Sequence, residues 1–365
     1  MNATPTTPEL AAALRDHFAR VILPIWRGPG FNAALGLPYE AVAADGRTPL
    51  PVVRYRAMAC ARQMFVFALS GEMQHAQRLF ESLNLFRDSK RGGWFYSVDA
   101  HGVPLDTTKD LYTHAFVVFA CAEYGARSGN DDALSIVHQA SSLIEDRFGA
   151  DDGLLHAALA ADFSTTNSMP LQNPLMHLTE AWLAARSATG DAAFDTALSK
   201  LGNAIARTFV HRPTGCIAEL PVGSEDNRLE PGHQFEWFWL VQQAGDVLNG
   251  SGLRDALARA FMFAHERGVD AATGGVHAAL DEAGGIKDST QRIWAQTEYL
   301  RALAVHGDAA TRAMLPQQIG RFQPRFLSAQ GWIECKRQTG EVAREDMPST
   351  TPYHLATAYA ALPEA

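Results

Sequence analysis

Histidine recurs at one place of a repeating sequence pattern, at the opening of an apolar segment with the length of a helix. Four of the 13 histidines stand there: His114, His177, His233 and His354. Two further segments carry Arg54 and Gln296 at the same place. One histidine on an apolar helix is usually a buried core residue, but four at one repeat position favour a shared site. Because imidazole titrates near neutrality, that site suits proton transfer.

Carboxylates accompany two of these histidines at helical spacing. Glu180 follows His177 by three residues, and Glu236 follows His233 by three. Side chains three apart share a helix face, so each carboxylate can tune a neighbouring imidazole. Histidine with carboxylates can also bind zinc or a pair of metal ions. The HxxE order and the lack of HExxH or an acidic cluster favour a site without a metal, and we expect no cofactor.

The elements that must position these groups repeat about every 60 residues. Short glycine-led segments with β-like residues are spaced 56 to 62 residues apart, and a helix-like apolar run opens about twenty residues after each. Their starts are Gly93, Gly153, Gly215, Gly275 and Gly331. With a further copy near Arg54, six units account for the whole chain.

Each unit has room for two helices of different character. The run from Ala115 to Ala122 is apolar on all sides, as a helix enclosed by neighbours requires. The second helices are amphipathic, with Leu198, Leu201 and Ile205 on one face of a polar segment. Pro8 to Trp26 supplies another outer helix ahead of the first unit. We therefore expect six inner and six outer helices.

The two ends of the chain complement each other, because the first outer helix lacks an inner partner and the last inner helix lacks an outer one. Closure into a ring satisfies both, whereas an open array needs polar capping units. The sequence therefore predicts an all-α (α/α)6 toroid, with short β-hairpin excursions at one mouth. Residues 1–365 would form a single catalytic domain, and the first-turn residues of the inner helices would converge on one funnel.

Composition narrows the function further. The net charge of −9 and the absence of a Lys/Arg run argue against nucleic acid as a partner. No apolar stretch is long enough to cross a bilayer, and the N-terminus lacks the pattern of a signal peptide. The four cysteines are far apart, which fits reduced thiols. We expect a cytoplasmic protein, either a monomer or a homodimer.

Aromatic residues cluster near the expected mouth and could stack on the faces of a sugar, although packing between layers is the commoner role. They are Trp94, Phe95, Tyr96 and Trp332 in the excursions, and Trp237, Trp239 and Trp294 at helix openings. A neutral, hydroxylated ligand such as a monosaccharide fits such a rim.

At these residues the sequence resembles the N-acylglucosamine 2-epimerase superfamily, which also contains cellobiose 2-epimerases, mannose isomerases and sulfoquinovose isomerases. The resemblance covers the whole chain and is carried by four strings: Asn173 to Glu180 (NPLMHLTE), Glu230 to Trp237 (EPGHQFEW), Gln296 to Glu298 (QTE), and Pro352 to His354 (PYH). It implies an (α/α)6 barrel, no obligatory metal, and His233 and His354 as the catalytic pair. Its sugar-binding set corresponds to Arg54, Tyr112, Asn173, His177, Glu236 and Trp294. The pattern of this chain adds His114 and Glu180 to the expected substrate-binding residues.

One departure points to a branch of the superfamily. Many of its epimerases carry a Trp-Lys pair ahead of the last Pro-Tyr-His, where this chain has Pro348 to Thr351 (PSTT), a spelling closer to the isomerases. We therefore expect an aldose–ketose isomerase of free hexoses, first of all one converting D-mannose to D-fructose through an enediolate. Sugar 2-epimerases of the N-acylglucosamine, mannose/glucose or cellobiose type are the nearest alternative. A glycoside hydrolase, which would need two flanking carboxyls, and a non-catalytic scaffold are more distant ones.

Overall fold

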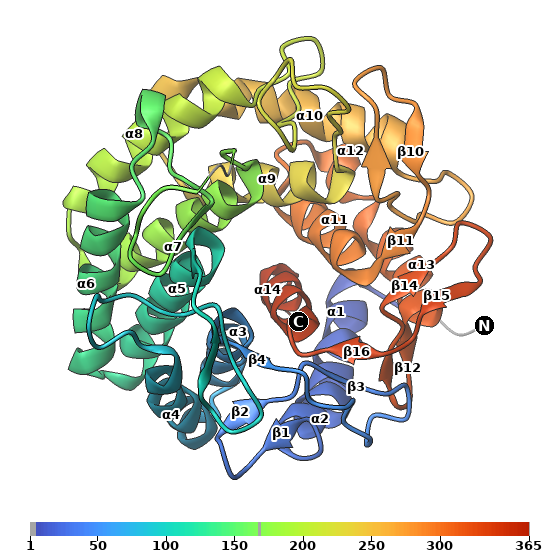
Figure 1. Cartoon of the computed structure of the whole chain (residues 1–365). Helices are drawn as coiled ribbons and strands as arrows, with labels where there is room; N and C mark the ends of the chain where they lie inside the picture. Colours follow the sequence, from blue (N-terminus) through green and yellow to red (C-terminus); the bar gives the residue numbers. More distant parts are fainter. Residues whose placement is uncertain (1–4, 167–168, 365) are drawn as a thin grey trace.

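Helices form two concentric layers around a central axis in the computed structural model, which describes residues 5–166 and 169–364 (Figure 1). Six helices of the described chain make the inner layer, and each contacts the next until the last contacts the first. These are α3 (Ala57–Leu69), α5 (Leu111–Ser128), α7 (Gln172–Thr189), α9 (Pro231–Gln243), α11 (Ile293–Val305) and α14 (Thr351–Ala361). The predicted (α/α)6 toroid is confirmed.

The outer layer covers the inner one pair by pair. Its main helices are α1 (Thr7–His17), α4 (Met73–Ser82), α6 (Asp131–Arg147), α8 (Ala193–Thr208), α10 (Leu253–Gly268) and α13 (Leu315–Phe326). A π-helical turn, Phe18–Ile22, joins α1 to α2 (Leu23–Arg27). Shorter pieces are α12 (Ala309–Arg312) and the 3-10 turns Leu83–Phe86, Asp151–Gly153 and Asn249–Ser251.

Burial separates the two layers as the sequence pattern predicts. Leu111 and every residue from Thr113 to Ala122 of α5 are buried, whereas α8 buries only the face that carries Phe194, Leu198 and Ile205. The side chain of Asp110 caps α5 by accepting a hydrogen bond from the backbone of Thr113. The inner helices therefore pack on both sides, and the outer ones on a single side.

The ring closes through segments more than 300 residues apart. The outer helix α1 contacts the inner helix α14, so the first and last helices form the sixth pair (Figure 1). Arg15 fastens this pair by donating hydrogen bonds to the backbone carbonyls of Tyr359 (3.1 Å) and Leu362 (2.6 Å). The expected complementarity of the two ends is confirmed.

Short antiparallel ladders link successive units at the mouth where the inner helices begin. The residues just before an inner helix pair with the excursion of the next unit in β4–β5, β7–β8, β11–β14 and, closing the ring, β16–β3. Further pairs are β1–β2, β5–β6, β9–β10, β12–β13 and β14–β15. Strands β1 to β8 are Phe31–Asn32, Leu37–Pro38, Ala41–Val42, Tyr55–Arg56, Ser97–Val98, Pro104–Asp106, Lys109–Asp110 and Ala158–Leu159. Strands β9 to β16 are Ala279–Leu280, Ile286–Asp288, Gln291–Arg292, Leu327–Ser328, Gly331–Trp332, Cys335–Lys336, Val342–Arg344 and Met347–Pro348.

The glycine-led segments serve mainly as turns that return the chain from an outer helix. Ile217 forms a β-bridge with Val210 at the end of α8, and Val276 forms one with Val269 at the end of α10. Gly215 has φ +79°, and a Cβ there would lie 2.2 Å from the carbonyl oxygen of Ala256. Glycine is therefore required at this tight turn. No helix of the described residues combines the length and apolar character needed to cross a membrane.

Candidate active site

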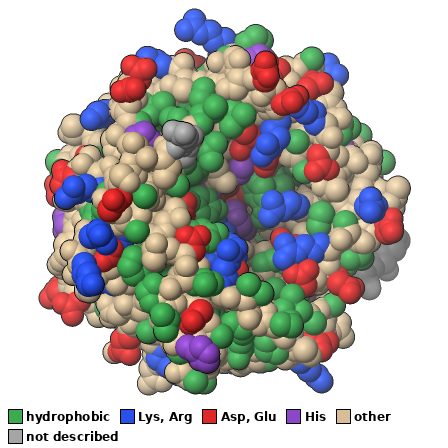
Figure 2. Space-filling model, viewed as in Figure 1, with side chains coloured by type: hydrophobic (Ala, Val, Ile, Leu, Met, Phe, Trp, Pro, Cys, Tyr) green, Lys and Arg blue, Asp and Glu red, His purple; other side chains and the backbone are tan. Residues whose placement is uncertain are grey.

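A cavity of about 260 Å³ lies where the first turns of the inner helices meet. In Figure 2 it is the hollow near the centre of the face, with histidine side chains inside and basic side chains beside it. It is lined by Arg62, Tyr112, Asn173, His177, Glu219, Arg228, Glu230, His233, Glu236, Arg292, Trp294, Thr350, Thr351 and His354. The lining is predominantly polar, as a hydroxylated ligand requires.

Equivalent positions of the inner helices supply most of this lining. The second residues of α5, α7 and α11 are Tyr112, Asn173 and Trp294, and the sixth residues of α3, α7 and α9 are Arg62, His177 and Glu236. Residues four apart lie on one helix face, so both sets point toward the axis at successive depths.

His233 is held by carboxylates from the loop ahead of its own helix. Its Nδ1 lies 2.7 Å from Glu219 Oε1 and 3.6 Å from a carboxylate oxygen of Glu230. Burial opposes the charged imidazole, but these two carboxylates outweigh that effect and raise the pKa of His233 to about 9. The ring is therefore an imidazolium at neutral pH, and its charge is balanced locally.

Gln172, the first residue of α7, fixes the Glu219 carboxylate. Its Nε2 donates to both carboxylate oxygens, at 3.0 and 3.1 Å, while its Oε1 accepts a 2.8 Å hydrogen bond from Trp237 Nε1. Its backbone N–H also donates to the carbonyl of Glu219 at 3.5 Å. An ordered carboxylate of this kind holds the facing imidazole in one orientation.

His354 has the opposite protonation state. Burial, reinforced by the positive Arg62 and by His177, holds the pKa of His354 well below its usual value. Its Nδ1 lies 2.9 Å from Glu298 Oε1. A neutral ring that donates its Nδ1 proton to this carboxylate keeps a lone pair on Nε2, which is the state of a general base.

Trp294 packs against both histidine rings. Its centroid is 5.0 Å from that of His233 and 5.5 Å from that of His354, with interplanar angles of 36° and 39°. An indole next to a proton donor and a proton acceptor can support one face of a sugar.

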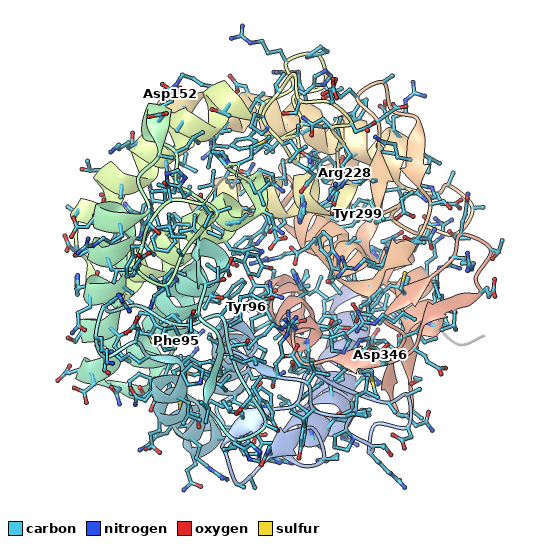
Figure 3. All side chains as sticks on the ribbon, viewed as in Figure 1. Phe95, Tyr96, Asp152, Arg228, Tyr299 and Asp346 are labelled. Atoms are coloured by element: carbon cyan, nitrogen blue, oxygen red, sulfur yellow. The ribbon has the colours of Figure 1, made fainter. Side chains whose placement is uncertain are left out.

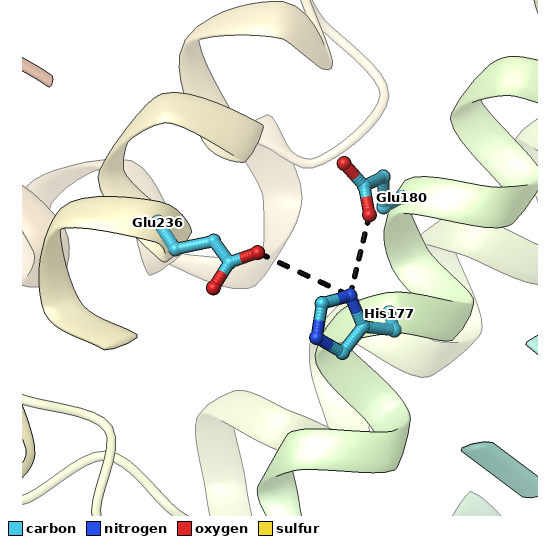
Figure 4. A group of neighbouring side chains, drawn as sticks. All are labelled: His177, Glu180 and Glu236. Carbon is cyan, nitrogen blue, oxygen red and sulfur yellow. Dashed lines mark hydrogen bonds and ion pairs between the residues drawn. The ribbon is translucent and has the colours of Figure 1, made fainter. Parts of the chain in front are cut away.

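The floor of the cavity is a buried cluster of His177, Glu180 and Glu236 (Figure 4). His177 Nδ1 lies 3.3 Å from a carboxylate oxygen of Glu180 and 4.0 Å from one of Glu236. Burial lowers the pKa of His177 to about 4. Burial and the neighbouring Glu298 and Glu180 raise the pKa of Glu236 well above its usual value.

Seven of the ten site residues expected from the sequence line the cavity. They are His233, His354, Tyr112, Asn173, His177, Glu236 and Trp294. Glu180 lies one turn deeper, where it accepts a hydrogen bond from the hydroxyl of Tyr353. The structure does not bring Arg54 or His114 into the cavity.

Arg54 precedes β4 and places its guanidinium 5.3 Å from the centroid of the Tyr96 ring. Arg62, eight residues later, supplies the cation in the cavity, where its Nη2 donates to the hydroxyl of Tyr112 at 2.6 Å. In the sequence, Arg62 and Gln63 are a polar pair inside the apolar run of α3, a signal that could have identified this position.

His114 supports the backbone of an excursion. Its Nε2 accepts a hydrogen bond from the backbone N–H of Trp94 at 3.1 Å. Gln234 and Gln296 use their side-chain oxygens in the same way, accepting from the backbone N–H of Ile217 and Val276. His114 is thus the equivalent of Gln234, one residue after His233, and His177 is the equivalent of Glu236, so the four histidines do not share one helix position.

Sequence reasoning also did not assign Glu219, Gln172 and Glu298 to the site, nor the lining residues Arg228, Glu230, Arg292, Thr350 and Thr351. Glu298 stands in the QTE string two residues after Gln296. Glu219 follows the glycine-led segment at Gly215 directly, but no local pattern marks it.

Metal ions could be held at three places in the described part of the chain. Each has three side chains whose ligand atoms lie within 4.8 Å of one another: His177/Glu180/Glu236, Glu219/Glu230/His233 and Glu236/Glu298/His354. The Nδ1 atoms of these histidines already bind carboxylates. A metal-free site stays a prediction.

Comparison with known proteins decides the family. The family model of N-acylglucosamine 2-epimerase (GlcNAc 2-epimerase) matches residues 39–358. The chain belongs to this family. A mannose-6-phosphate isomerase of Rhizobium meliloti (strain 1021) is 28% identical over 376 residues, which cover 95% of this chain and 94% of the relative. A D-mannose isomerase of Pseudomonas cannabina pv. alisalensis is 33% identical over 172 residues, 42% of this chain and 41% of the relative.

The solved cellobiose 2-epimerase from Bacillus thermoamylovorans B4167 superposes with a TM-score of 0.85 at 18% identity, covering 96% of this chain and 98% of that one. This likeness shows the shared toroid. Membership in the N-acylglucosamine 2-epimerase family makes the protein an enzyme of the sugar isomerase and 2-epimerase group, and its substrate is a sugar.

Proposed function

We propose that the protein is an aldose–ketose isomerase that converts D-mannose to D-fructose. The observation that carries the proposal is the pair of histidines in opposite protonation states, both packed against Trp294 in one cavity. Proton transfer through an enediolate needs one neutral base and one proton donor, and the cavity supplies both at neutral pH.

In the first half of the reaction, His354 Nε2 takes the proton from C2 of the open-chain aldose. The electron pair of the broken C–H bond forms the C1–C2 double bond, and O1 takes a proton from His233. In the second half, O2 returns a proton to His233 as the C2 carbonyl forms, and C1 takes the proton held by His354 after that proton has exchanged with solvent. Both histidines end in their starting states.

Other groups of the cavity match the charge that develops. Arg62 carries the positive charge that we expected from Arg54, next to the hydroxyl of Tyr112. Glu236 lines the cavity and can form a hydrogen bond with a sugar hydroxyl. Buried donors aimed at a developing oxyanion are typical of such catalysis.

Two relatives support an isomerase, since they are named mannose-6-phosphate isomerase and D-mannose isomerase, whereas other relatives are named cellobiose 2-epimerase. The PSTT sequence before Pro352 supports the same reaction. A 2-epimerase could use the same histidines if His233 delivered its proton to the opposite face of C2. The position of solvent deuterium in the product separates these reactions.

A second candidate is the same reaction on a 6-phosphorylated aldose. A cavity of about 300 Å³ adjoins the site and shares Arg228, Glu230, Arg292 and Trp294 with it. Arg228 lies in the loop ahead of α9, on the side of the central opening nearer α9 and α11 in Figure 3. Lys287 adds a third cation, and such a group can bind a phosphate. The relative from Rhizobium meliloti favours this candidate by its name.

The deciding experiment is incubation with D-mannose, D-glucose, N-acetylmannosamine, cellobiose and mannose 6-phosphate in D2O, followed by NMR. We expect D-mannose to give D-fructose with deuterium at C1. Glucose labelled at C2 without ketose would establish the epimerase instead. The second candidate is correct if mannose 6-phosphate reacts at least tenfold faster than mannose, and if Arg292→Met abolishes this difference without changing the rate on mannose.

A further inference from the structure

Arg301 is a buried cation on α11 that does not line the cavity with the histidines. Only 2% of its side chain is exposed. It borders a separate cavity of about 610 Å³, lined by the C-terminal halves of the inner helices at the opposite end of the ring. A buried charge is costly unless it is paired, so the partners of Arg301 indicate its role.

The guanidinium contacts two carboxylates from different helices. Its Nη1 lies 3.2 Å from Glu298 Oε2, on its own helix, and its Nη2 lies 3.6 Å from Glu180 Oε1, on α7. Its Cζ lies 3.4 Å from the ring centroid of Trp239 on α9, so a cation–π contact also holds the guanidinium in place.

Each of these carboxylates uses its other oxygen to hold a histidine of the cavity. Glu298 Oε1 accepts from His354 Nδ1, and Glu180 Oε2 faces His177 Nδ1. One guanidinium therefore fixes two carboxylates that each orient an imidazole.

Glu298 is also surrounded by groups that act on its charge in opposite directions. The titratable groups around it are Arg301 on its own helix, Glu180 and His177 on α7, Glu236 on α9 and His354 on α14. Burial is the largest effect that raises the pKa of Glu298, and Glu180 adds to it, while Arg301 lowers that pKa. Without the guanidinium, Glu298 would take up a proton more readily and hold His354 less firmly.

We propose that Arg301 is a positioning residue, which holds the carboxylates of Glu298 and Glu180 in place and thereby sets the tautomer and orientation of His354 and His177. The inference rests on His354 acting as a base, whichever sugar reacts. The arginine acts from the far side of the ring, without touching the substrate.

The test compares Arg301→Ala and Arg301→Lys with the wild type on whichever sugar the wild type converts. For Arg301→Ala we expect kcat to fall about 10²-fold or more with KM changed less than about threefold, because a misdirected base affects the chemical step. The acid limb of the kcat–pH profile should move to higher pH, because Glu298 protonates earlier. Arg301→Lys should recover part of kcat, since an ammonium keeps the charge but loses the fork of donors.

Guanidinium ion provides a further readout, because truncating Arg301 opens its space toward the 610 Å³ cavity. We expect low millimolar guanidinium chloride to raise kcat of Arg301→Ala at least fivefold. Arg127→Ala is the matched control: Arg127 lines the same cavity but pairs with Glu123, so its kcat should stay near wild type and should not respond to guanidinium.

A measurement without substrate separates this inference from the proposed function. In 15N-histidine spectra, His354 of the wild type should show the Nδ1-protonated tautomer, and Arg301→Ala or Arg301→Lys should shift it. An unchanged His354 signal in the folded variants, or an Arg301→Ala enzyme with wild-type kcat, would overturn the role of Arg301. If Arg301→Ala does not fold, an Arg301→Lys variant with wild-type kcat and His354 signal gives the same negative answer.

Discussion

Replacing Glu219 by Gln should move the alkaline limit of activity, because this carboxylate is the largest cause that raises the pKa of His233. The pKa of His233 is about 9 against an ordinary value of 6.5. That difference corresponds to about 3.4 kcal/mol of preference for the imidazolium. Glu230 remains 3.6 Å away in the variant, so we expect the pKa to fall only part of the way, to roughly 7.5.

The assay is kcat/KM from pH 5 to 10. His233 of the wild type is half protonated near pH 9, whereas only about 3% would be protonated in Glu219→Gln at that pH. Activity at pH 9 should therefore fall roughly 15-fold relative to wild type, while activity at pH 6.5 stays within about twofold. The wild type itself should show a broad plateau, since the pKa of His354 lies well below neutrality.

The pH dependence of the free energy of unfolding gives an independent check of the raised pKa of His233. A group whose folded-state pKa is raised adds stability that is fully present below pH 6.5 and is lost as pH rises through about 9. Glu219→Gln should therefore lower the free energy of unfolding by about 1–3 kcal/mol at pH 6.5 and by less at pH 10. The control is Glu282→Gln, because Glu282 lies beside His211 and outside the site. This variant should change neither the pH–activity profile nor the pH dependence of the free energy of unfolding. An alkaline limb that stays near pH 9 in Glu219→Gln would refute the charged state assigned to His233.

Three further outcomes are expected. His233→Ala and His354→Ala should each lower kcat by about 10²–10⁴-fold with an unchanged circular dichroism spectrum, and a near wild-type rate in either variant would remove that histidine from catalysis. Dialysis against EDTA should leave full activity with less than one metal ion per chain by elemental analysis, whereas a loss that zinc or manganese restores would show that one of the His/Glu clusters is a metal site. Gly232→Ala should raise KM and cost about 1–3 kcal/mol of stability in urea unfolding, because its Cβ would lie 2.7 Å from the Trp294 ring; unchanged KM and stability would show that the ring can move aside.

The ring could be predicted from the sequence because each unit repeats the same order of structural elements. An apolar helix, an amphipathic helix and a glycine turn recur about every 60 residues, so six weak signals reinforce one another. The same redundancy placed His177, His233 and His354 near one mouth. The repeat did not determine the exact helix position of each histidine. His114 and Gln234 occupy equivalent positions, and only their hydrogen bonds with the backbone N–H groups of Trp94 and Ile217 reveal this.

The parts that could not be predicted depend on missing caps and on distant contacts. No side chain caps the start of α3, so nothing in the sequence marks that the helix begins at Ala57, and the repeat pattern predicts Arg54 at the place that Arg62 takes in the cavity. Glu219 reaches His233 because α7 begins with Gln172, 47 residues earlier. Contacts of this range leave no periodic signal in a single sequence.

Ring closure through α1 and α14 has a consequence for how the enzyme acquires activity. The hydrogen bonds from Arg15 to the end of α14 span 344 and 347 residues, so the loop entropy of nearly the whole chain opposes them. His354, the proposed base, lies on that same helix and enters the cavity only when α14 docks between α3 and α11. During synthesis, the first five inner helices can pack while the chain is still inactive. Proton transfer then begins only with the final docking event, so the onset of turnover during refolding would report closure of the ring.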